Sequence, residues 1–351
     1  MTILQLCSDD DRRGAQVFAA ELGDRLQELG HDVVTVGLAK GAVGGLDMRV
    51  LGSSRFDRGA LGALRGLMQR SDVVVAHGST TLPASALAGL GVSTPVVYRQ
   101  ISDPAYWTPT LAKRARVAAY YRFPRHVVAL SPATRQVMVD RFRVPERKIS
   151  VIPNAVDERR HKRASEGART NARAKLGLDP DDVVVAYVGA LVEEKGVGDL
   201  IAAAQPGWKL VFAGDGRGRF GFEEAARQRA LDVRFLGPVA DPTQVYAAAD
   251  VFVLPSWSEQ QPGVLIEAAL AGVPCVVTDV GLTRELMDDG YAALMVPTRD
   301  RDALGQAIAE LLADPRRRRT IAARATQHLQ RHHTLAAVAP QWAKLLARVA
   351  E

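Results

Sequence analysis

The stretch DVFVLPSWSEQQPGVLIEAALAGVPCVVTD, residues 250–279, carries the clearest indication of the fold. An apolar run, VFVL, is followed by a polar loop. Pro262 then suits the first turn of a helix that runs through VLIEAALAG and ends at Gly272. A second apolar run, VPCVV, follows at once. Two apolar strands joined by a helix of this length predict a parallel βαβ unit.

The same alternation of short apolar runs and amphipathic stretches extends along the whole chain. In the first half the runs are TILQLC, HDVVTVGL, DVVVAHG, TPVVYRQ, HVVAL and KISVIP. In the second half they are VVVAYVG, WKLVFAG, DVRFLG, DVFVLPS, VPCVVTD and AALMVP. Buried parallel strands have this continuous apolar character. The chain therefore belongs to the α/β class, and two successive α/β units explain it better than one large sheet.

Polar residues separate the two series and set the expected domain boundaries. Residues 157–182 are charged and poor in large apolar groups, which predicts a linker followed by a solvated helix. We expect an N-terminal domain over residues 1–155 and a C-terminal domain over 156–334. The apolar stretch at 335–351 is expected to form a helix that returns to the first domain. Another helix is expected over 15–29, with Phe18, Leu22, Leu26 and Leu29 on one face.

Composition and charge limit the classes of function. The 351 residues are 47% hydrophobic and 24% charged, an ordinary globular composition. No apolar run approaches the roughly 20 residues that a membrane span needs. Residues 1–163 hold 24 Lys and Arg against 15 Asp and Glu, and the remainder holds 21 against 24. The basic half predicts either an attraction to anionic surfaces or acceptors, or merely solvated faces in an arginine-rich protein.

Nucleic acid is not expected as a partner, because no zinc finger or aromatic RNA-binding platform accompanies the positive charge. The cysteines Cys7 and Cys275 each close an apolar run and indicate buried thiols in a reducing compartment. The opening segment MTILQLCSDDDRRG predicts a strand ending in charges, not a cleavable signal. We therefore expect a cytoplasmic protein, with association at the inner face of the cell membrane as an alternative location.

Two glutamates in the quoted stretch, Glu259 and Glu267, are the first candidate site. The free N–H groups at the helix start, on Gly263, Val264 and Leu265, predict an anion-binding site. Glu267 lies about one turn further into the helix, where its carboxylate can accept two hydrogen bonds from a vicinal diol such as a ribose. Glu259 precedes the helix and can reach a sugar hydroxyl. The alternative is a Glu267 paired with an arginine and a Glu259 on the surface.

Two glycine-containing loops follow strands of the second series. In GALVEEKGV, residues 189–197, Lys195 is a candidate phosphate ligand, and a surface lysine on a turn is the alternative. The loop GDGRGR, residues 214–219, has a glycine pair, but Arg219 occupies the third glycine position of a dinucleotide fingerprint. A nicotinamide site is therefore not expected. The sequence also has no P-loop and no G-x-S-x-G nucleophile elbow.

The first half offers two further candidates at the ends of strands. Asp9, Asp10 and Asp11 can hold a divalent cation, although Arg12 and Arg13 follow them, so a solvated loop or helix cap is the favoured alternative. His77 ends the strand DVVVAHG, where a ligand cleft is expected. A core histidine is the alternative for His77.

Taken together, these motifs resemble those of the retaining, nucleotide-sugar-dependent glycosyltransferases of the GT4 family. The resemblance covers nearly the whole chain, through RGAQVFAAELGDRLQELGHDV, DVVVAHG, VVALSPATRQVM, KISVIPNAVD, GALVEEKG, VFAGDGR, VRFLGPV and DVFVLPSWSEQQPGVLIEAALAGVPCVVTDVG. The resemblance implies the GT-B architecture, with two Rossmann-like α/β/α domains that face each other across a cleft.

The resemblance also implies roles for individual residues. Glu259 matches the glutamate that contacts the donor sugar, Glu267 the one that holds the ribose, and Lys195 the phosphate-binding lysine. His77 matches a histidine near the transferred sugar, and Gly14 the second glycine of a loop near the phosphates. The amides around the first helical turn match those that bind the diphosphate, and the turn up to Val239 matches the one that reads the base.

Three positions depart from the family pattern. Ala190 stands where an arginine is usual, Arg13-Gly14 replaces a glycine pair, and Asn154-Ala155 replaces Asn-Gly. Loss of the arginine removes a charge-assisted hydrogen bond worth about 1.5–3 kcal/mol. Our hypothesis is that Arg13 supplies the missing positive charge from across the cleft.

The reaction implied is transfer of a hexosyl or N-acetylhexosaminyl group from a UDP- or GDP-linked sugar to an acceptor hydroxyl, in glycan, glycolipid or glycoconjugate synthesis. The acceptor is a small molecule, a lipid-linked molecule or a glycan, and neither a metal ion nor another cofactor is expected. The basic and aromatic stretch at 111–125 predicts either membrane contact or simply a helix that leads into HVVAL. The alternatives are a weak or inactive sugar-nucleotide binder, given Ala190, and a relative that performs phosphorolysis or epimerisation.

Overall fold

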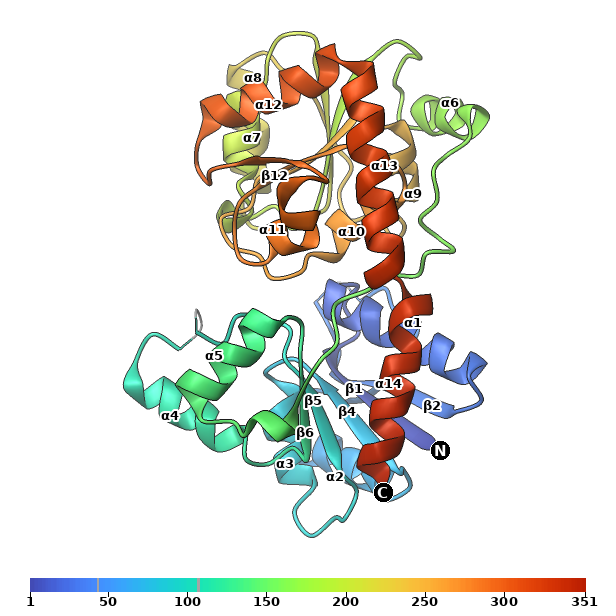
Figure 1. Cartoon of the computed structure of the whole chain (residues 1–351), viewed down its shortest axis with the longest axis vertical. Coiled ribbons are helices and arrows are strands. Elements are labelled where there is room, and N and C mark those ends of the chain that lie inside the picture. The colour runs from blue at the N-terminus through green and yellow to red at the C-terminus, as the bar shows by residue number, and fades with distance from the viewer. Residues whose placement is uncertain (43, 106–107) are drawn as a thin grey trace. The chain divides into compact units, whose positions relative to one another are not determined.

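The computed structural model describes residues 1–42, 44–105 and 108–351. The chain forms two compact units (Figure 1). Unit 1 comprises Met1–Val156 and Leu335–Glu351, and unit 2 comprises Asp157–Thr334. The domain boundaries expected from the sequence lie after residues 155 and 334.

Unit 1 contains a seven-stranded parallel sheet in the order β3-β2-β1-β4-β5-β6-β7. Its strands are β1 (Thr2–Asp9), β2 (Asp32–Ala39), β3 (Arg49–Gly52), β4 (Val73–His77), β5 (Val96–Arg99), β6 (His126–Ala129) and β7 (Ile149–Val151). All five residues of β4 are buried, as expected of a central strand that is covered on both faces.

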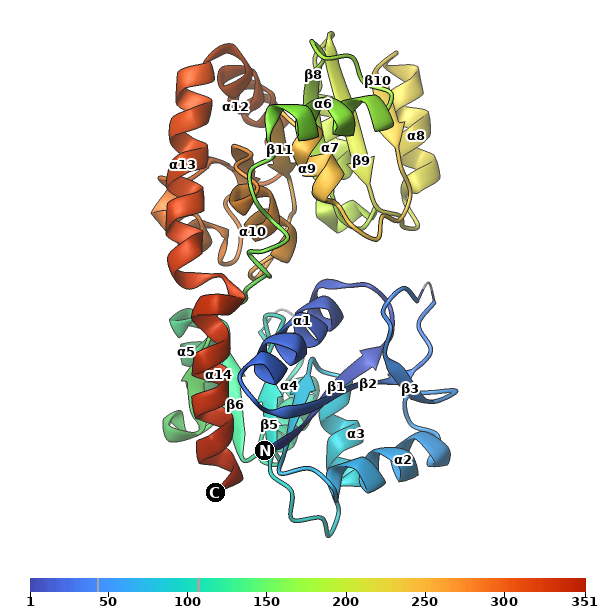
Figure 2. The same cartoon turned by 90° about the vertical axis from the view of Figure 1, so that its right-hand side faces the viewer.

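Helices cover both faces of this sheet. They are α1 (Gly14–Glu28), α2 (Arg58–Met68), α3 (Thr81–Ala88), α4 (Leu111–Tyr120), α5 (Pro132–Phe142) and α14 (Leu335–Ala350), with a 3-10 turn, η1, at Glu146–Lys148. Apolar residues of α1 and α14 form one core with β1, β4 and β5, and α2, α3 and α5 contribute to a second core. Figure 2 shows α14 running beside α1 on unit 1. The C-terminal helix therefore packs on unit 1, although the whole of unit 2 separates it in sequence from the rest of that unit.

Unit 2 contains a six-stranded sheet in the order β10-β9-β8-β11-β12-β13, again parallel throughout. The strands are β8 (Val183–Val188), β9 (Trp208–Ala213), β10 (Asp232–Phe235), β11 (Val251–Leu254), β12 (Cys275–Thr278) and β13 (Leu294–Val296). The helices are α6 (Glu166–Lys175), α7 (Val197–Ala203), α8 (Arg219–Gln228), α9 (Thr243–Ala248), α10 (Gly263–Leu270), α11 (Thr283–Leu286), α12 (Arg301–Ala313) and α13 (Pro315–His332), with 3-10 turns η2 (Glu193–Lys195) and η3 (Asp288–Gly290). Both units are Rossmann-like α/β domains.

The twelve apolar runs of the sequence all become strands, which confirms the predicted α/β class. The sequence missed β3, because this four-residue edge strand has no fully buried residue and no long apolar run. Leu29 was wrongly placed on the buried face of the first helix: it caps α1 and is 48% exposed. The solvated helix expected in the linker is α6, but its Arg173 is buried and pairs with Asp250 at 2.9 Å.

The strand order gives each unit one point at which the direction of winding reverses. In unit 1 it lies between β1 and β4, and in unit 2 between β8 and β11. Ligands of open parallel sheets bind outside the carboxyl ends of the strands at such points. A ligand site is therefore expected at the loops that follow these four strands.

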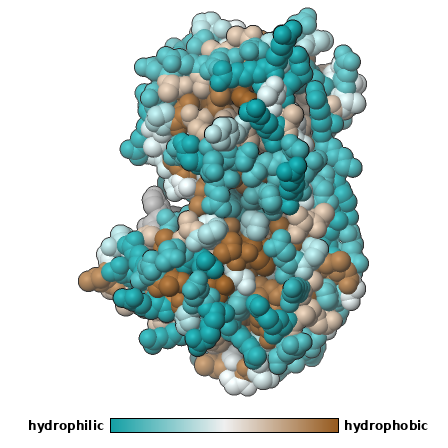
Figure 3. Space-filling view, viewed as in Figure 1, coloured by the Kyte–Doolittle hydropathy of each residue, from teal (hydrophilic) through white to brown (hydrophobic). Residues whose placement is uncertain are grey.

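The face of the surface seen in Figure 3 carries both apolar and hydrophilic residues. Figure 3 shows apolar residues gathered at several places between hydrophilic ones. Within the described parts of the chain, no helix combines the length and the apolar character needed to cross a membrane.

Candidate functional site

The winding reversal of unit 2 brings together two of the predicted residues. Lys195 ends η2 in the loop after β8, and Glu259 lies in the loop after β11. Lys195 Nζ lies 2.6 Å from Glu259 Oε1, and the buried Ser256 hydroxyl donates to the same oxygen at 2.8 Å. The Lys195 side chain is 30% exposed and that of Glu259 only 10%. Glu259 is therefore not the surface residue that the sequence left as an alternative, whereas Lys195, at the end of a 3-10 turn, keeps part of its side chain exposed.

Close backbone packing fixes these two loops against each other. Gly196 has φ +67°, and a β-carbon there would lie 1.9 Å from the carbonyl oxygen of Pro255. The Trp257 amide donates to the Glu194 carbonyl at 2.9 Å. The Trp257 indole donates to Asp199 at 2.8 Å. The ion pair therefore sits on a closely packed junction, although the sequence offered only the glycine as a sign of it.

The helix α10 begins where the anion site was predicted, with two corrections. Pro262 is the N-cap residue, whereas the sequence placed it in the first helical turn. The Leu265 amide donates to the Pro262 carbonyl at 3.2 Å, so the prediction of a free N–H there is wrong. The short i→i−3 bond is common at helix starts. Gly263 and Val264 are the first two helical residues, and their role in anion binding stays a prediction.

Glu267 lies in the fifth position of α10 and is half-buried. The Tyr246 hydroxyl donates to its Oε2 at 2.7 Å. Burial, and then the charge of Glu267, raise the pKa of Tyr246 well above its ordinary value, so the phenol stays protonated and donates. The sequence did not single out Tyr246, which precedes Glu267 by 21 residues and belongs to another helix.

The loop around Ala190 is shaped by its backbone. The Tyr187 hydroxyl donates to the Ala190 carbonyl at 2.9 Å. The Leu191 amide donates to the Asp215 carbonyl at 3.0 Å, and a β-carbon on Gly216 would lie 2.5 Å from the Leu191 carbonyl oxygen. The glycines of the GDGRGR loop thus allow two loops to pack closely. Val239, the predicted base-reading position, is half-buried in the turn after β10.

In unit 1 the acidic run is neither solvated nor an evident cation site. Asp9, Asp10 and Asp11 are at most 3% exposed. Asp9 pairs with Arg55 at 2.7 Å, and Asp10 with Lys40 at 2.7 Å. The hydrogen bond from Lys40, and then that from the Gly41 amide, lower the pKa of Asp10. Asp10, and Asp11 through the Gly44 amide at 2.8 Å, therefore fasten the segment after β2 to the end of β1, and Asp9 fastens the segment after β3.

Arg13 and Gly14 follow this acidic run at the start of α1, and both are exposed. Arg13 pairs with Asp11 at 2.9 Å. A β-carbon on Gly14 would meet no atom within 4 Å, so packing inside unit 1 does not require glycine there.

His77 ends β4 but is buried in unit 1. Its Nε2 lies 3.0 Å from Gln5 Oε1, and its ring packs against Phe18 and Trp342 at centroid distances of 6.1 and 6.4 Å. Burial, and then the charge of Arg99, hold the pKa of His77 well below its ordinary value, so the ring is neutral. These contacts are those of a core histidine, the alternative that the sequence left open. Its role beside a sugar stays a prediction.

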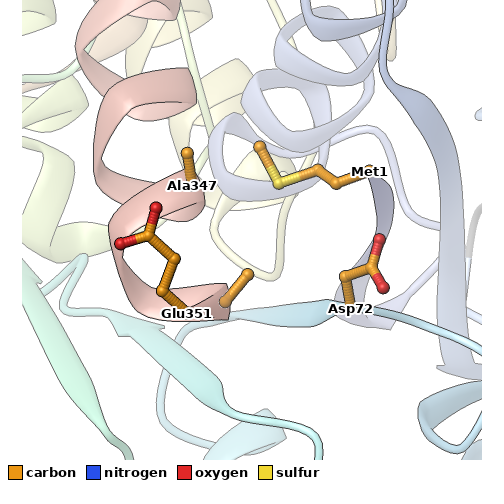
Figure 4. Close-up of a pocket in the computed structure, with 5 residues that line it drawn as sticks. Met1, Asp72, Ala347 and Glu351 are labelled. Carbon is orange, nitrogen blue, oxygen red and sulfur yellow. The ribbon is translucent and has the colours of Figure 1, made fainter.

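Two other features bear on ligands. Among the described residues, no group of three or more His, Cys, Asp or Glu side chains is arranged to hold a metal ion. A hollow of about 370 Å³ is lined by Met1, Asp72, Ala347, Ala350 and Glu351, and Figure 4 shows how the labelled residues among them lie. Met1 and Asp72 precede β1 and β4, so this hollow lies at the amino ends of the strands, away from the expected site.

The chain matches two protein-family models. The model described as "Glycosyl transferases group 1" matches residues 168–328, and "Glycosyltransferase Family 4" matches residues 12–160. D-inositol 3-phosphate glycosyltransferase of Segniliparus rotundus is 34% identical over 198 residues, which cover 52% of this chain and 43% of that protein. Glycogen synthase of Mycobacterium tuberculosis is 29% identical over 88% of this chain and 74% of its own. The chain spans about half the length of most of the curated relatives compared with it.

Solved structures share the fold over the full chain. HepE of Anabaena, in complex with UDP-glucose, matches with a TM-score of 0.87 and 22% identity, covering 99% of this chain and 100% of that one. The lipopolysaccharide glycosyltransferase WaaG matches with a TM-score of 0.74 and 17% identity, covering 98% and 99%.

The junction under the Lys195–Glu259 pair gives a prediction about glycine. Gly196→Ala and Gly207→Ala both place a β-carbon on a left-handed residue, at a cost of about 1–2 kcal/mol each. A β-carbon at Gly207 meets nothing within 4 Å, whereas at Gly196 it meets the Pro255 carbonyl. Thermal unfolding should therefore show the larger loss of stability for Gly196→Ala. Hydrogen exchange at the Trp257 amide should rise in that variant alone. Equal exchange in the two variants would contradict the proposed junction.

Proposed function

Because the chain belongs to the group 1 glycosyl transferases, the GT4 family with the GT-B fold, we propose that it transfers a sugar from a nucleotide diphosphate sugar to an acceptor hydroxyl with retention of the anomer. The observation that carries the proposal is the arrangement at the winding reversal of unit 2. There the Lys195–Glu259 pair and the start of α10, with Glu267 in its fifth position, follow adjacent strands. These groups offer a cation, backbone donors and a diol acceptor within one structural unit.

The chemistry of transfer accounts for these groups. The bond between the anomeric carbon and the diphosphate oxygen breaks, and a bond from that carbon to the acceptor oxygen forms on the same face. The leaving phosphate accepts the acceptor's proton. Negative charge then grows on the diphosphate, where Lys195 and the amides of Gly263 and Val264 would stabilise it. Glu259, which Lys195 and Ser256 hold by one oxygen, would orient the sugar.

The scheme uses no metal ion and no resident cofactor, and the donor is a co-substrate. The HepE structures that share this fold contain UDP or UDP-glucose, which makes UDP the first donor nucleotide to test, with GDP as the alternative. The group expected to be transferred is a hexosyl or N-acetylhexosaminyl group. A second candidate function is a sugar-nucleotide binder with weak or no transfer activity, which Ala190 favours because the usual arginine is missing.

Nucleotide binding is tested first by thermal shift with UDP, GDP and ADP and then with their sugar forms. A ligand at 100 times its Kd should stabilise unit 2 by about 2.7 kcal/mol. Glu267→Gln should lose most of this shift, whereas Glu224→Gln, on α8 and with a side chain that is 40% exposed, should keep it. Donor turnover, measured as sugar release or transfer, separates an enzyme from a silent binder. No shift with any of these nucleotides would overturn the proposal.

Arg13 is proposed to add positive charge at the diphosphate, in place of the arginine lost at position 190. Arg13→Ala should then weaken nucleotide diphosphate binding by about tenfold or more, since a hydrogen bond to a charged group contributes about 1.5–3 kcal/mol. The neighbouring Arg12→Ala is the matched control and should have little effect. The pair with Asp11 means that Arg13 must exchange one anionic partner for another. Equal and small effects of both variants, measured by calorimetric titration, would end this hypothesis.

Membrane contact through α4 is a further part of the proposal. Its cations Lys113, Arg114 and Arg116, and Arg122 and Arg125 after it, form no ion pair with any described residue. Leu111 at its start is 75% exposed, and the sequence has no acidic residue between Asp103 and Asp140. Such a helix suits the anionic surface of the inner leaflet, where a lipid-linked acceptor would be presented.

Sedimentation with vesicles containing phosphatidylglycerol checks this contact. The protein should bind at low salt and less at high salt, because the attraction is electrostatic. Lys113→Glu with Arg116→Glu should abolish binding. The control Arg316→Glu with Arg319→Glu, on α13, changes the net charge equally and should bind as before. Binding that the two double variants reduce alike would argue against an α4 surface.

A further inference from the structure

Tyr246 is a buried phenol whose polar end reaches the proposed nucleotide site. The residue lies on α9, is 1% exposed, and donates to Glu267 Oε2 at 2.7 Å. Its ring packs edge-on against Phe252, with 5.8 Å between centroids, and against His161, at 6.3 Å. Aromatic contacts on two sides leave the ring little freedom. The hydroxyl is thus presented to the carboxylate from a fixed position.

A buried phenol does not need a carboxylate to satisfy its hydroxyl. Tyr187, equally buried in the same unit, donates to a backbone carbonyl, that of Ala190. Tyr121 in unit 1 donates to the side-chain oxygen of Gln100 at 2.7 Å. Tyr246 is paired instead with a half-buried carboxylate, which is costly to remove from water. A structural role alone would be served as well by a neutral acceptor.

The pairing also constrains the carboxylate. Glu267 has three side-chain torsions, and a hydrogen bond to one oxygen from a fixed donor limits the rotamers that it populates. A group held ready in its binding geometry loses less entropy when the ligand arrives. The same bond commits Oε2 to the protein, which sets the direction of the carboxylate plane.

We propose that Tyr246 is a positioning residue that holds the Glu267 carboxylate in the orientation that receives the vicinal diol of the donor's ribose. The inference rests on the proposed function, because it takes a ribonucleotide as the ligand of Glu267. It adds the means by which a ribose is distinguished from a deoxyribose. Discrimination of that kind comes from a polar group left without its partner when a hydroxyl is missing.

The test compares each nucleoside diphosphate with its 2′-deoxy form, using UDP, GDP and ADP, by calorimetric titration of the full chain. The wild-type protein should bind its preferred ribonucleotide about tenfold or more tightly than the deoxy form. In Tyr246→Phe this ratio should fall close to one, through weaker binding of the ribonucleotide and nearly unchanged binding of the deoxy form. A merely structural role would weaken both ligands alike.

Two further variants complete the design. Tyr121→Phe also removes a buried hydroxyl hydrogen bond, but in unit 1, and should keep the wild-type ratio. Glu267→Asp withdraws the carboxylate from Tyr246 without altering the aromatic packing, and should lose the discrimination even if Tyr246→Phe proves unstable. An unchanged ratio in Tyr246→Phe, with the discrimination lost in Glu267→Asp, refutes the inference and leaves the proposed function standing. Failure of the wild-type protein to bind any of the six probes refutes both.

Discussion

The ion pair between Lys195 and Glu259 is the contact around which the candidate site is organised. It joins residues 64 positions apart, because β8 and β11 are neighbours in the sheet and their carboxyl ends share an edge. Both side chains are largely removed from water, so loss of either would leave the other charge poorly compensated. The close approach of Gly196 to Pro255 and the hydroxyl of Ser256 keep the pair in place. Donor binding would therefore act on an arrangement that already exists.

The two cations proposed for phosphate binding each have a partner within their own unit. Lys195 is opposed by Glu259, and Arg13 by Asp11. A diphosphate carries negative charge that neither pair can neutralise without giving up a partner. Backbone donors are different, since the amides and macrodipole at the start of α10 have no counter-charge to lose. These amides should accordingly carry a larger share of phosphate binding here than in a site with an additional arginine.

The sequence predicted the strands better than the contacts between the loops that follow them. Apolar runs bounded by glycines identified twelve strands and placed Lys195 and Glu259 in loops after two of them, and the structure adds that these loops meet. The edge strand β3 has too few buried residues to produce a pattern. The bond from Tyr246 to Glu267 joins two helices through tertiary packing, which periodicity does not report. The acidic run after β1 looked solvated because its partners Lys40 and Arg55 lie far along the chain.

At Ala190 the shape of the loop does not depend on the side chain, so the shape and the charge of the loop can be considered separately. The loop there is fixed by the Tyr187 hydroxyl at the Ala190 carbonyl and by the backbone contacts of Leu191 with the loop at Asp215. None of these contacts uses the side chain at position 190. Alanine at position 190, where the resemblance implies an arginine, therefore leaves the shape of the loop intact and removes only one positive charge. Because shape and charge are separable here, the chain can retain a donor site of normal geometry while its affinity for the diphosphate is set by groups elsewhere.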